Sequence, residues 1–324
     1  MELQTRVIVE PPRRLISHQD SILALGSCFS ENMAKKFEEF KFPCLVNPTG
    51  ILFNPASIAI TLGPDFPSII KDDQLTVLKD EQYCHFATHS DCSRATKDEL
   101  LSYISEAWQD MTRFLKSCNT VVLTWGTAWV YCLDSGFPVA SCHKAPGNMF
   151  KKTLLNYESI IEQYRDLLDS TLKDKRVILT ISPIRHLRDT LTLNQVSKSV
   201  LRLAAHDLTE EFSNVEYFPS YEIVLDELRD YRFYERDMLH PTDVTQEYIW
   251  ERLKETYFDQ NTKDFCQKWQ KVLHGMRHRP LNPDSKSHRL FLENLLKTVK
   301  TFKEVETKHE QAFLREKLKA FETL

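Results

Sequence analysis

Alternation between short apolar runs and amphipathic segments constrains the fold of this chain more than any other sequence feature. Uninterrupted apolar runs typical of buried parallel strands occupy residues 22–25, 121–125, 177–181 and 215–218, with a shorter run at 45–46. Helical periodicity separates them, at 33–40, 98–117, 156–172 and 195–212. The alternation predicts a three-layer α/β domain with a parallel sheet between two layers of helices.

The last third of the chain has a different character. From about Thr245 onward there is little strand signal, and apolar residues recur at spacings of three or four among Lys and Glu: Leu292, Leu295, Leu296, Val299, Phe302 and Val305. We therefore expect a domain over residues 1–255 and a helical extension over 256–324. The apolar face of the extension should pack on the domain or pair with a second copy, and a charged face of mixed sign argues against binding to a membrane surface.

Charge and composition exclude several classes of protein. A net charge of −4 provides no electrostatic reason to expect a nucleic-acid partner. No apolar run approaches the roughly 18–20 residues of a membrane span, and residues 1–6 lack the apolar stretch of a secretory signal. The eight cysteines form no C-x-x-C pair, and His85 and His89 lack convincing metal-binding partners. We expect reduced thiols, a cytoplasmic location and no bound metal.

The first candidate for chemistry is the segment Gly26-Ser27-Cys28-Phe29-Ser30, which directly follows an expected strand and begins an expected helix. Side chains at such a turn lie at the carboxyl edge of the sheet, where open α/β folds bind ligands. The start of a helix can hold an oxyanion and lower the pKa of a thiol. Both Ser27 and Cys28 are therefore candidate nucleophiles, although a helix cap and a small buried residue would explain them equally well.

The second candidate is the segment Asp237-Met238-Leu239-His240-Pro241. A carboxylate and an imidazole three residues apart on one turn can project in the same direction. Asp237 would then accept the Nδ1–H of His240 and leave Nε2 free as a general base.

Together the two segments resemble the GSCFA-domain proteins, a branch of the SGNH/GDSL hydrolase superfamily, and the resemblance covers roughly residues 3–255. Ser30 stands where the family name has Ala. Further motifs that carry the resemblance lie at residues 47–55, 126–131, 142–146, 181–186, 217–223 and 226–230. The resemblance implies a flavodoxin-like sheet and chemistry on acyl esters.

The same resemblance implies roles for individual residues. In register with the Gly-Asp-Ser of the superfamily, Cys28 occupies the position of the nucleophile and Ser27 that of the Asp, so we favour Cys28 over Ser27. His240 would move the proton and Asp237 would orient the ring. Gly50 matches the glycine of the oxyanion hole, but Gly126-Thr127 lacks the following asparagine, so Thr127 or Asn54 would have to supply that donor.

Two basic pairs, His143-Lys144 and Arg185-His186, follow the expected third and fourth strands and could bind an anionic substrate or a nucleotide-like acyl carrier. Surface or supporting roles explain these four residues equally well.

We therefore expect hydrolysis or transfer of an O-acyl group, with an O-acylated carbohydrate or another small ester as substrate and no cofactor. A CoA-dependent O-acyltransferase of polysaccharide biosynthesis, which would use CoA, is one alternative. A catalytically silent carbohydrate-binding or scaffold protein is the other, motivated by the missing asparagine.

Overall fold

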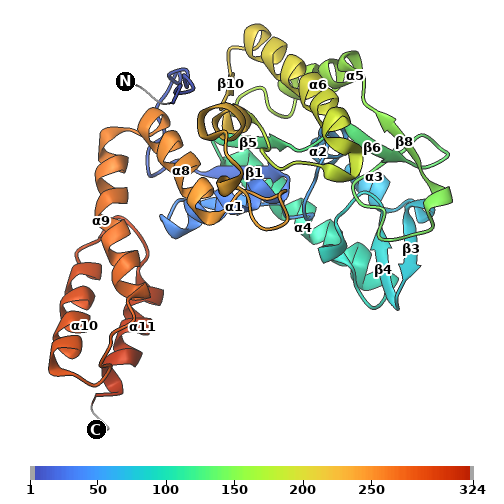
Figure 1. The fold of residues 1–324 in the computed structure, drawn as a ribbon. Coiled ribbons are helices and arrows are strands. Elements are labelled where there is room, and N and C mark those ends of the chain that lie inside the picture. The colour runs from blue at the N-terminus through green and yellow to red at the C-terminus, as the bar shows by residue number, and fades with distance from the viewer. Residues whose placement is uncertain (1–3, 322–324) are drawn as a thin grey trace.

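A five-stranded parallel sheet forms the centre of the molecule (Figure 1). The computed structural model describes residues 4–321. In spatial order the strands are β10 (Val215–Tyr217), β9 (Arg176–Ile181), β5 (Thr120–Trp125), β1 (Ile22–Gly26) and β2 (Cys44–Val46). All five strands predicted from apolar runs are confirmed. The α/β class with a parallel sheet is therefore confirmed as well.

Helices cover both faces of this sheet because alternate strand residues point to opposite sides. Leu23, Leu25 and their neighbours in β5 and β9 pack against one group of helices, which comprises α2 (Pro55–Leu62), α4 (Lys97–Ser117), α5 (Tyr157–Asp169) and α6 (Thr190–Glu211). Ile22 and Ile178 pack on the opposite face against α1 (Cys28–Glu39) and α8 (Asp243–Tyr257). The helices predicted around residues 33–40, 98–117, 156–172 and 195–212 are α1, α4, α5 and α6.

Short antiparallel elements that the sequence did not predict extend from the main sheet. A hairpin pairs β3 (Thr76–Lys79) with β4 (Gln82–His85), preceded by α3 (Phe66–Ile70). A second small sheet has the order β7 (Pro138–Val139), β6 (Trp129–Cys132), β8 (Lys151–Leu154). Near the end of the domain, α7 (Ser220–Glu222) continues into a π-helix (Ile223–Leu228).

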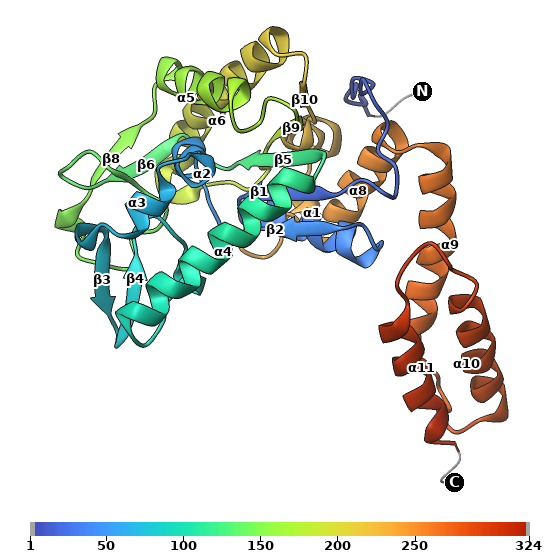
Figure 2. The ribbon, with the colours of Figure 1, turned by 180° about the vertical axis from the view of Figure 1, so that it is seen from behind.

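The C-terminal extension consists of α9 (Gln260–Arg277), α10 (Lys286–Val299) and α11 (Lys308–Lys319), as expected for a helical tail. Figure 2 shows α9 leading away from the sheet, with α10 and α11 beside its far half. Leu292, Leu295 and Leu314 are buried in the same core as α1 and α8. The indole Nε1 of Trp269 donates to the carbonyl of Glu39 (2.7 Å), which ties α9 to the end of α1. Within residues 4–321, no helix has the length and apolar character that crossing a bilayer requires.

Candidate active site

The turn after β1 depends on Gly26. Its φ is +142°, and a Cβ atom there would lie 2.2 Å from the carbonyl oxygen of Thr124 on β5, so no other residue fits without strain. Its N–H donates to Oδ1 of Asn47 at 2.8 Å. This close approach places Ser27 and Cys28 at the carboxyl edge of the sheet, as the sequence predicted.

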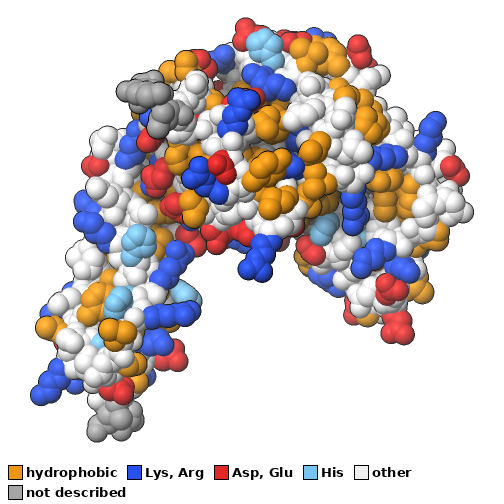
Figure 3. All heavy atoms as spheres, in the orientation of Figure 1, with side chains coloured by type: hydrophobic (Ala, Val, Ile, Leu, Met, Phe, Trp, Pro, Cys, Tyr) orange, Lys and Arg blue, Asp and Glu red, His pale blue; other side chains and the backbone are white. Residues whose placement is uncertain are grey.

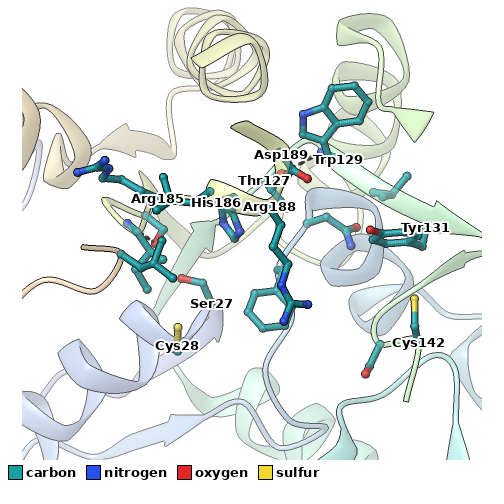
Figure 4. Close-up of a pocket in the computed structure, with 18 of the residues that line it drawn as sticks. Ser27, Cys28, Thr127, Trp129, Tyr131, Cys142, Arg185, His186, Arg188 and Asp189 are labelled. Carbon is teal, nitrogen blue, oxygen red and sulfur yellow. Dashed lines mark hydrogen bonds between the residues drawn. The ribbon is translucent and has the colours of Figure 1, made fainter. Parts of the chain in front are cut away.

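A cavity of about 520 Å³ opens at this edge (Figure 4). Its walls come from the start of α1, the segment before α2, the strands β6 to β8 and the loops after β9 and before α8. It contains all three residues proposed for nucleophile and base: Ser27, Cys28 and His240. Its walls also include the polar and aromatic residues Asn54, Thr127, Trp129, Tyr131, Lys152, Ser182, Arg185, His186, Arg188 and Asp189.

Asp237 and His240 form the predicted pair. Oδ2 of Asp237 lies 2.6 Å from Nδ1 of His240, while Oδ1 accepts the backbone N–H groups of Leu239 (2.8 Å) and His240 (3.1 Å). The hydrogen bond from His240, followed by those two N–H groups, lowers the pKa of Asp237 to about 2. An ionised carboxylate only accepts hydrogen bonds, so Nδ1 must carry the proton and Nε2 of a neutral ring is left as the basic nitrogen.

Cys28 is the first residue of α1 and is half-buried. Burial raises the pKa of the Cys28 thiol and outweighs the lowering effect of its own backbone N–H; the charge of Glu31 also raises the pKa, while the N–H of Phe29 and the charge of Lys198 lower it. The lowered thiol pKa expected at a helix start is therefore wrong, because the sequence indicates the helix but not the burial. Cys28 is a protonated thiol at neutral pH and needs a base to attack.

Ser27 occupies the N-cap position of α1 without capping the helix through its side chain. The residue is 2% exposed, and its Oγ has no hydrogen-bond partner among the described residues. Cys28 is only half-buried and is therefore more accessible than Ser27. Accessibility therefore favours Cys28 as the attacking group.

Asn54 presents a hydrogen-bond donor to the cavity. Its Oδ1 accepts the N–H of Ser57 (2.8 Å) and caps α2, which fixes the orientation of the amide. Within the described range 4–321 the side chain of Asn54 makes only this hydrogen bond through Oδ1, so Nδ2 is left without a partner, and Asn54 lines the cavity wall. Of the two donors considered for the missing asparagine, Asn54 is the one with a free N–H.

Three other residues proposed for the oxyanion hole have their donors engaged elsewhere. The N–H of Gly50 donates to Asn47 (2.8 Å), and those of Gly126 and Thr127 both donate to Phe53 (2.9 Å). The hydroxyl of Thr127 lies 3.0 Å from that of Ser197 and accepts the N–H of Trp129. Gly50 and Gly126 support the turn and do not line the cavity, so we no longer assign any of the three to the oxyanion.

The two basic pairs are separated by the structure. Both ring nitrogens of His143 are engaged, Nδ1 with Ser90 (3.1 Å) and Nε2 with the carbonyl of His85 (2.9 Å). Neither His143 nor Lys144 lines the cavity, whereas Arg185 and His186 do. Burial, followed by the charge of Lys198, lowers the pKa of His186 to about 4, so this imidazole is neutral and cannot provide a cationic anion site.

Lys198 is a residue that the sequence analysis overlooked. It lies on α6, is 1% exposed, and donates to the carbonyls of Gly126 and Ser182, both at 2.6 Å. Those carbonyls follow the neighbouring strands β5 and β9, so the ammonium joins the two strand ends beside the cavity. Its position three residues before Leu201, on the apolar face of the predicted helix, was the available signal.

These features define the class of protein: a parallel α/β domain with a Cys or Ser, a His and an Asp at the carboxyl edge of its sheet. The sequence model of the GSCFA family matches residues 21–253, and that of the GSCFA domain protein, C-terminal domain, matches residues 269–320. The chain therefore belongs to the GSCFA family. No curated protein and no solved structure shows significant similarity to it.

Proposed function

We propose that the protein is an acyl-ester enzyme of the SGNH hydrolase type, in which Cys28 attacks the ester, His240 moves the proton and Asp237 orients His240. Counted along the chain, the strands of the sheet have the order 2-1-3-4-5, which supports a flavodoxin-like arrangement. The observation that carries the proposal is that the Asp237–His240 pair, Cys28 and the free amide of Asn54 meet at one cavity.

In the first step, Nε2 of His240 takes the thiol proton as the sulfur of Cys28 bonds to the ester carbonyl carbon. The raised pKa of Cys28 makes this general-base step necessary, since little thiolate exists beforehand. The carbonyl oxygen becomes an oxyanion, for which the N–H of Cys28 and Nδ2 of Asn54 are the donors we assign.

In the second step the C–O bond breaks, the departing alkoxide takes the proton from His240, and a thioester remains on Cys28. Water, or an acceptor alcohol, then attacks the thioester carbonyl while His240 removes its proton. The C–S bond breaks, the sulfur of Cys28 takes that proton back from His240, and the acyl group leaves as the acid or the new ester. The first acceptor gives hydrolysis and the second gives acyl transfer, so one site supports both reactions.

An O-acylated carbohydrate remains the substrate that we favour. Trp129 and Tyr131 line the cavity, and Tyr131 is 43% exposed. Aromatic rings of this kind combine an apolar face with a polar edge, which suits a ligand with both apolar C–H and hydroxyl groups.

The test is hydrolysis of 4-nitrophenyl acetate by the wild-type protein and by Cys28→Ala and Ser27→Ala. Loss of the attacking group should lower the rate by about 10⁴-fold, whereas loss of a supporting hydroxyl should cost far less. Turnover retained by Cys28→Ala but lost in Ser27→Ala would identify a serine enzyme. If the wild-type protein neither hydrolyses this ester nor transfers its acetyl group to added sugars, the cavity is a ligand-binding site without catalytic activity.

A further inference from the structure

One cation in the cavity has no partner within residues 4–321. Arg188 belongs to the 3-10 turn Leu187–Asp189 that follows β9, and it lines the cavity wall. No hydrogen bond, ion pair or ring contact from the part of the chain that the structure describes engages its guanidinium. Figure 4 shows its side chain starting beside His186 and extending into the cavity down to about the level of Ser27.

The other charges at the cavity are already engaged. Lys152 pairs with Asp189, the only carboxylate among the lining residues, and its ammonium lies 5.1 Å from the Trp129 ring centre. The guanidinium of Arg185 stacks over the rings of Tyr231 (5.3 Å) and Tyr234 (5.0 Å). Lys152, Arg185 and Arg188 outnumber the carboxylate of Asp189 on the wall and that of Asp237 behind His240, so the cavity has an excess of positive charge, and Arg188 is its free cation.

This excess is a local feature. The chain as a whole has a net charge of −4, and on the face in Figure 3 basic and acidic side chains are interspersed. Arg188 is exposed, so solvent screens its charge, but an excess of one sign of charge around a concave site still attracts an anion of the opposite sign.

We propose that Arg188 binds an anionic group, a carboxylate or a phosphate, on the molecule whose ester is presented to Cys28. A planar guanidinium donates two parallel hydrogen bonds to either group, which lysine cannot do. The role of the ester rests on the proposed function. The anion site itself does not, because binding can be measured without turnover.

Calorimetric titration with three phenols tests the site: 4-hydroxybenzoate, 4-hydroxyphenyl phosphate and the neutral 4-hydroxybenzamide. The three share one ring and differ in the group opposite the hydroxyl. We expect the wild-type protein to bind at least one anion about 10- to 100-fold more tightly than the amide. The anion that binds more tightly relative to the amide identifies carboxylate or phosphate as the natural group.

Arg188→Gln should remove this preference, and Arg188→Lys should restore only part of it. Arg113→Gln is the matched control, because it removes the same charge from an exposed position on α4 where the partner is Asp110. Arg188 is exposed, so its replacement should leave the melting temperature unchanged. Equal binding of anion and amide, no binding of any of the three, or a preference that survives Arg188→Gln would overturn the proposal.

The acetate esters of the same phenols separate this inference from the enzymatic one. If the anionic esters have the higher kcat/KM and Arg188→Gln removes that advantage, both proposals are supported. If no ester is turned over but the anions still bind through Arg188, the anion site stands and the enzymatic proposal fails. Turnover that does not depend on the anionic group leaves the enzyme in place and overturns the role of Arg188.

Discussion

Oδ2 of Asp237 accepts a hydrogen bond from Nδ1 of His240 at 2.6 Å, and His240 forms part of the wall that also contains Cys28. Asp237 and His240 lie in one loop before α8, so a single segment supplies both base and orienting group. Their side chains are 44% and 47% exposed, so solvent weakens the electrostatic part of the interaction. Its main effect is to fix the tautomer and the direction of the ring.

Replacement of Asp237 by Asn should lower kcat by up to about 10⁴-fold, because the amide no longer fixes the tautomer and direction of the His240 ring. The pKa of Asp237 is lowered to about 2, so the carboxylate is present above its unfolded pKa and is lost only as the pH falls toward 2. Steady-state rates between about pH 5 and 9 measure this. A variant that keeps the wild-type kcat across that range would contradict the assignment.

Asn54→Asp separates the two functions of Asn54. The carboxylate keeps an oxygen to cap α2, but at a position that is only 4% exposed it carries a desolvation cost, so the melting temperature should fall moderately while the protein stays folded. The N–H donor is lost and a negative charge faces the oxyanion, so kcat should fall by about 10²- to 10³-fold. Thermal melts and rates on 4-nitrophenyl acetate provide the two readouts. An active Asn54→Asp variant would remove Asn54 from the oxyanion hole.

The sequence predicted the main sheet because its strands are fully buried and therefore uninterrupted in apolar character. The strands β6 to β8 escaped prediction for the opposite reason. Lys151 and Lys152 of β8 are both polar, and the pairing of β8 with β6 depends on register between distant segments. These short strands nevertheless form one wall of the cavity, so the substrate side of the site could not be predicted.

The site residues that could be predicted are those whose relative position depends only on their neighbours in the sequence. The pairing of Asp237 with His240 follows from their spacing on one turn. The course of a loop cannot be predicted in this way. His143 and Lys144 have φ values of 49° and 55°, in the left-handed region, and both lie outside the cavity. Burial also depends on distant parts of the chain. Burial raises the pKa of the Cys28 thiol, whereas the helix start alone predicted a lowered pKa.

Lys198→Met should change how stability depends on pH. Burial lowers the pKa of Lys198 to about 7, so between about pH 7 and the unfolded value of about 10.4 the unfolded chain binds a proton that the folded chain does not. Wild-type stability should therefore rise relative to Lys198→Met across this range, by up to about 1.4 kcal/mol per pH unit. Urea unfolding of both proteins at several pH values measures the difference, and parallel curves would contradict it.

Two leucines of α10 test whether the C-terminal helices share the core of the domain. Leu295 is 8% exposed and Leu290 is 56% exposed. Leu295→Ala should lower the free energy of unfolding by about 2–4 kcal/mol, whereas Leu290→Ala should change it by less than about 0.5 kcal/mol. Both should unfold in one transition in urea. A separate early transition in Leu295→Ala would show that α10 and α11 unfold independently of the domain.

The acyl group trapped on the protein tests the central claim most directly. Wild-type protein is mixed with 4-nitrophenyl acetate, quenched in acid within the first turnover and digested, and the peptide containing residues 27 and 28 is analysed by mass spectrometry. We predict one acetyl group on this peptide that neutral hydroxylamine removes, as expected of a thioester on Cys28, and no acetylation in Cys28→Ala. An acetyl group that resists hydroxylamine and persists in Cys28→Ala would place the intermediate on Ser27 and contradict the account.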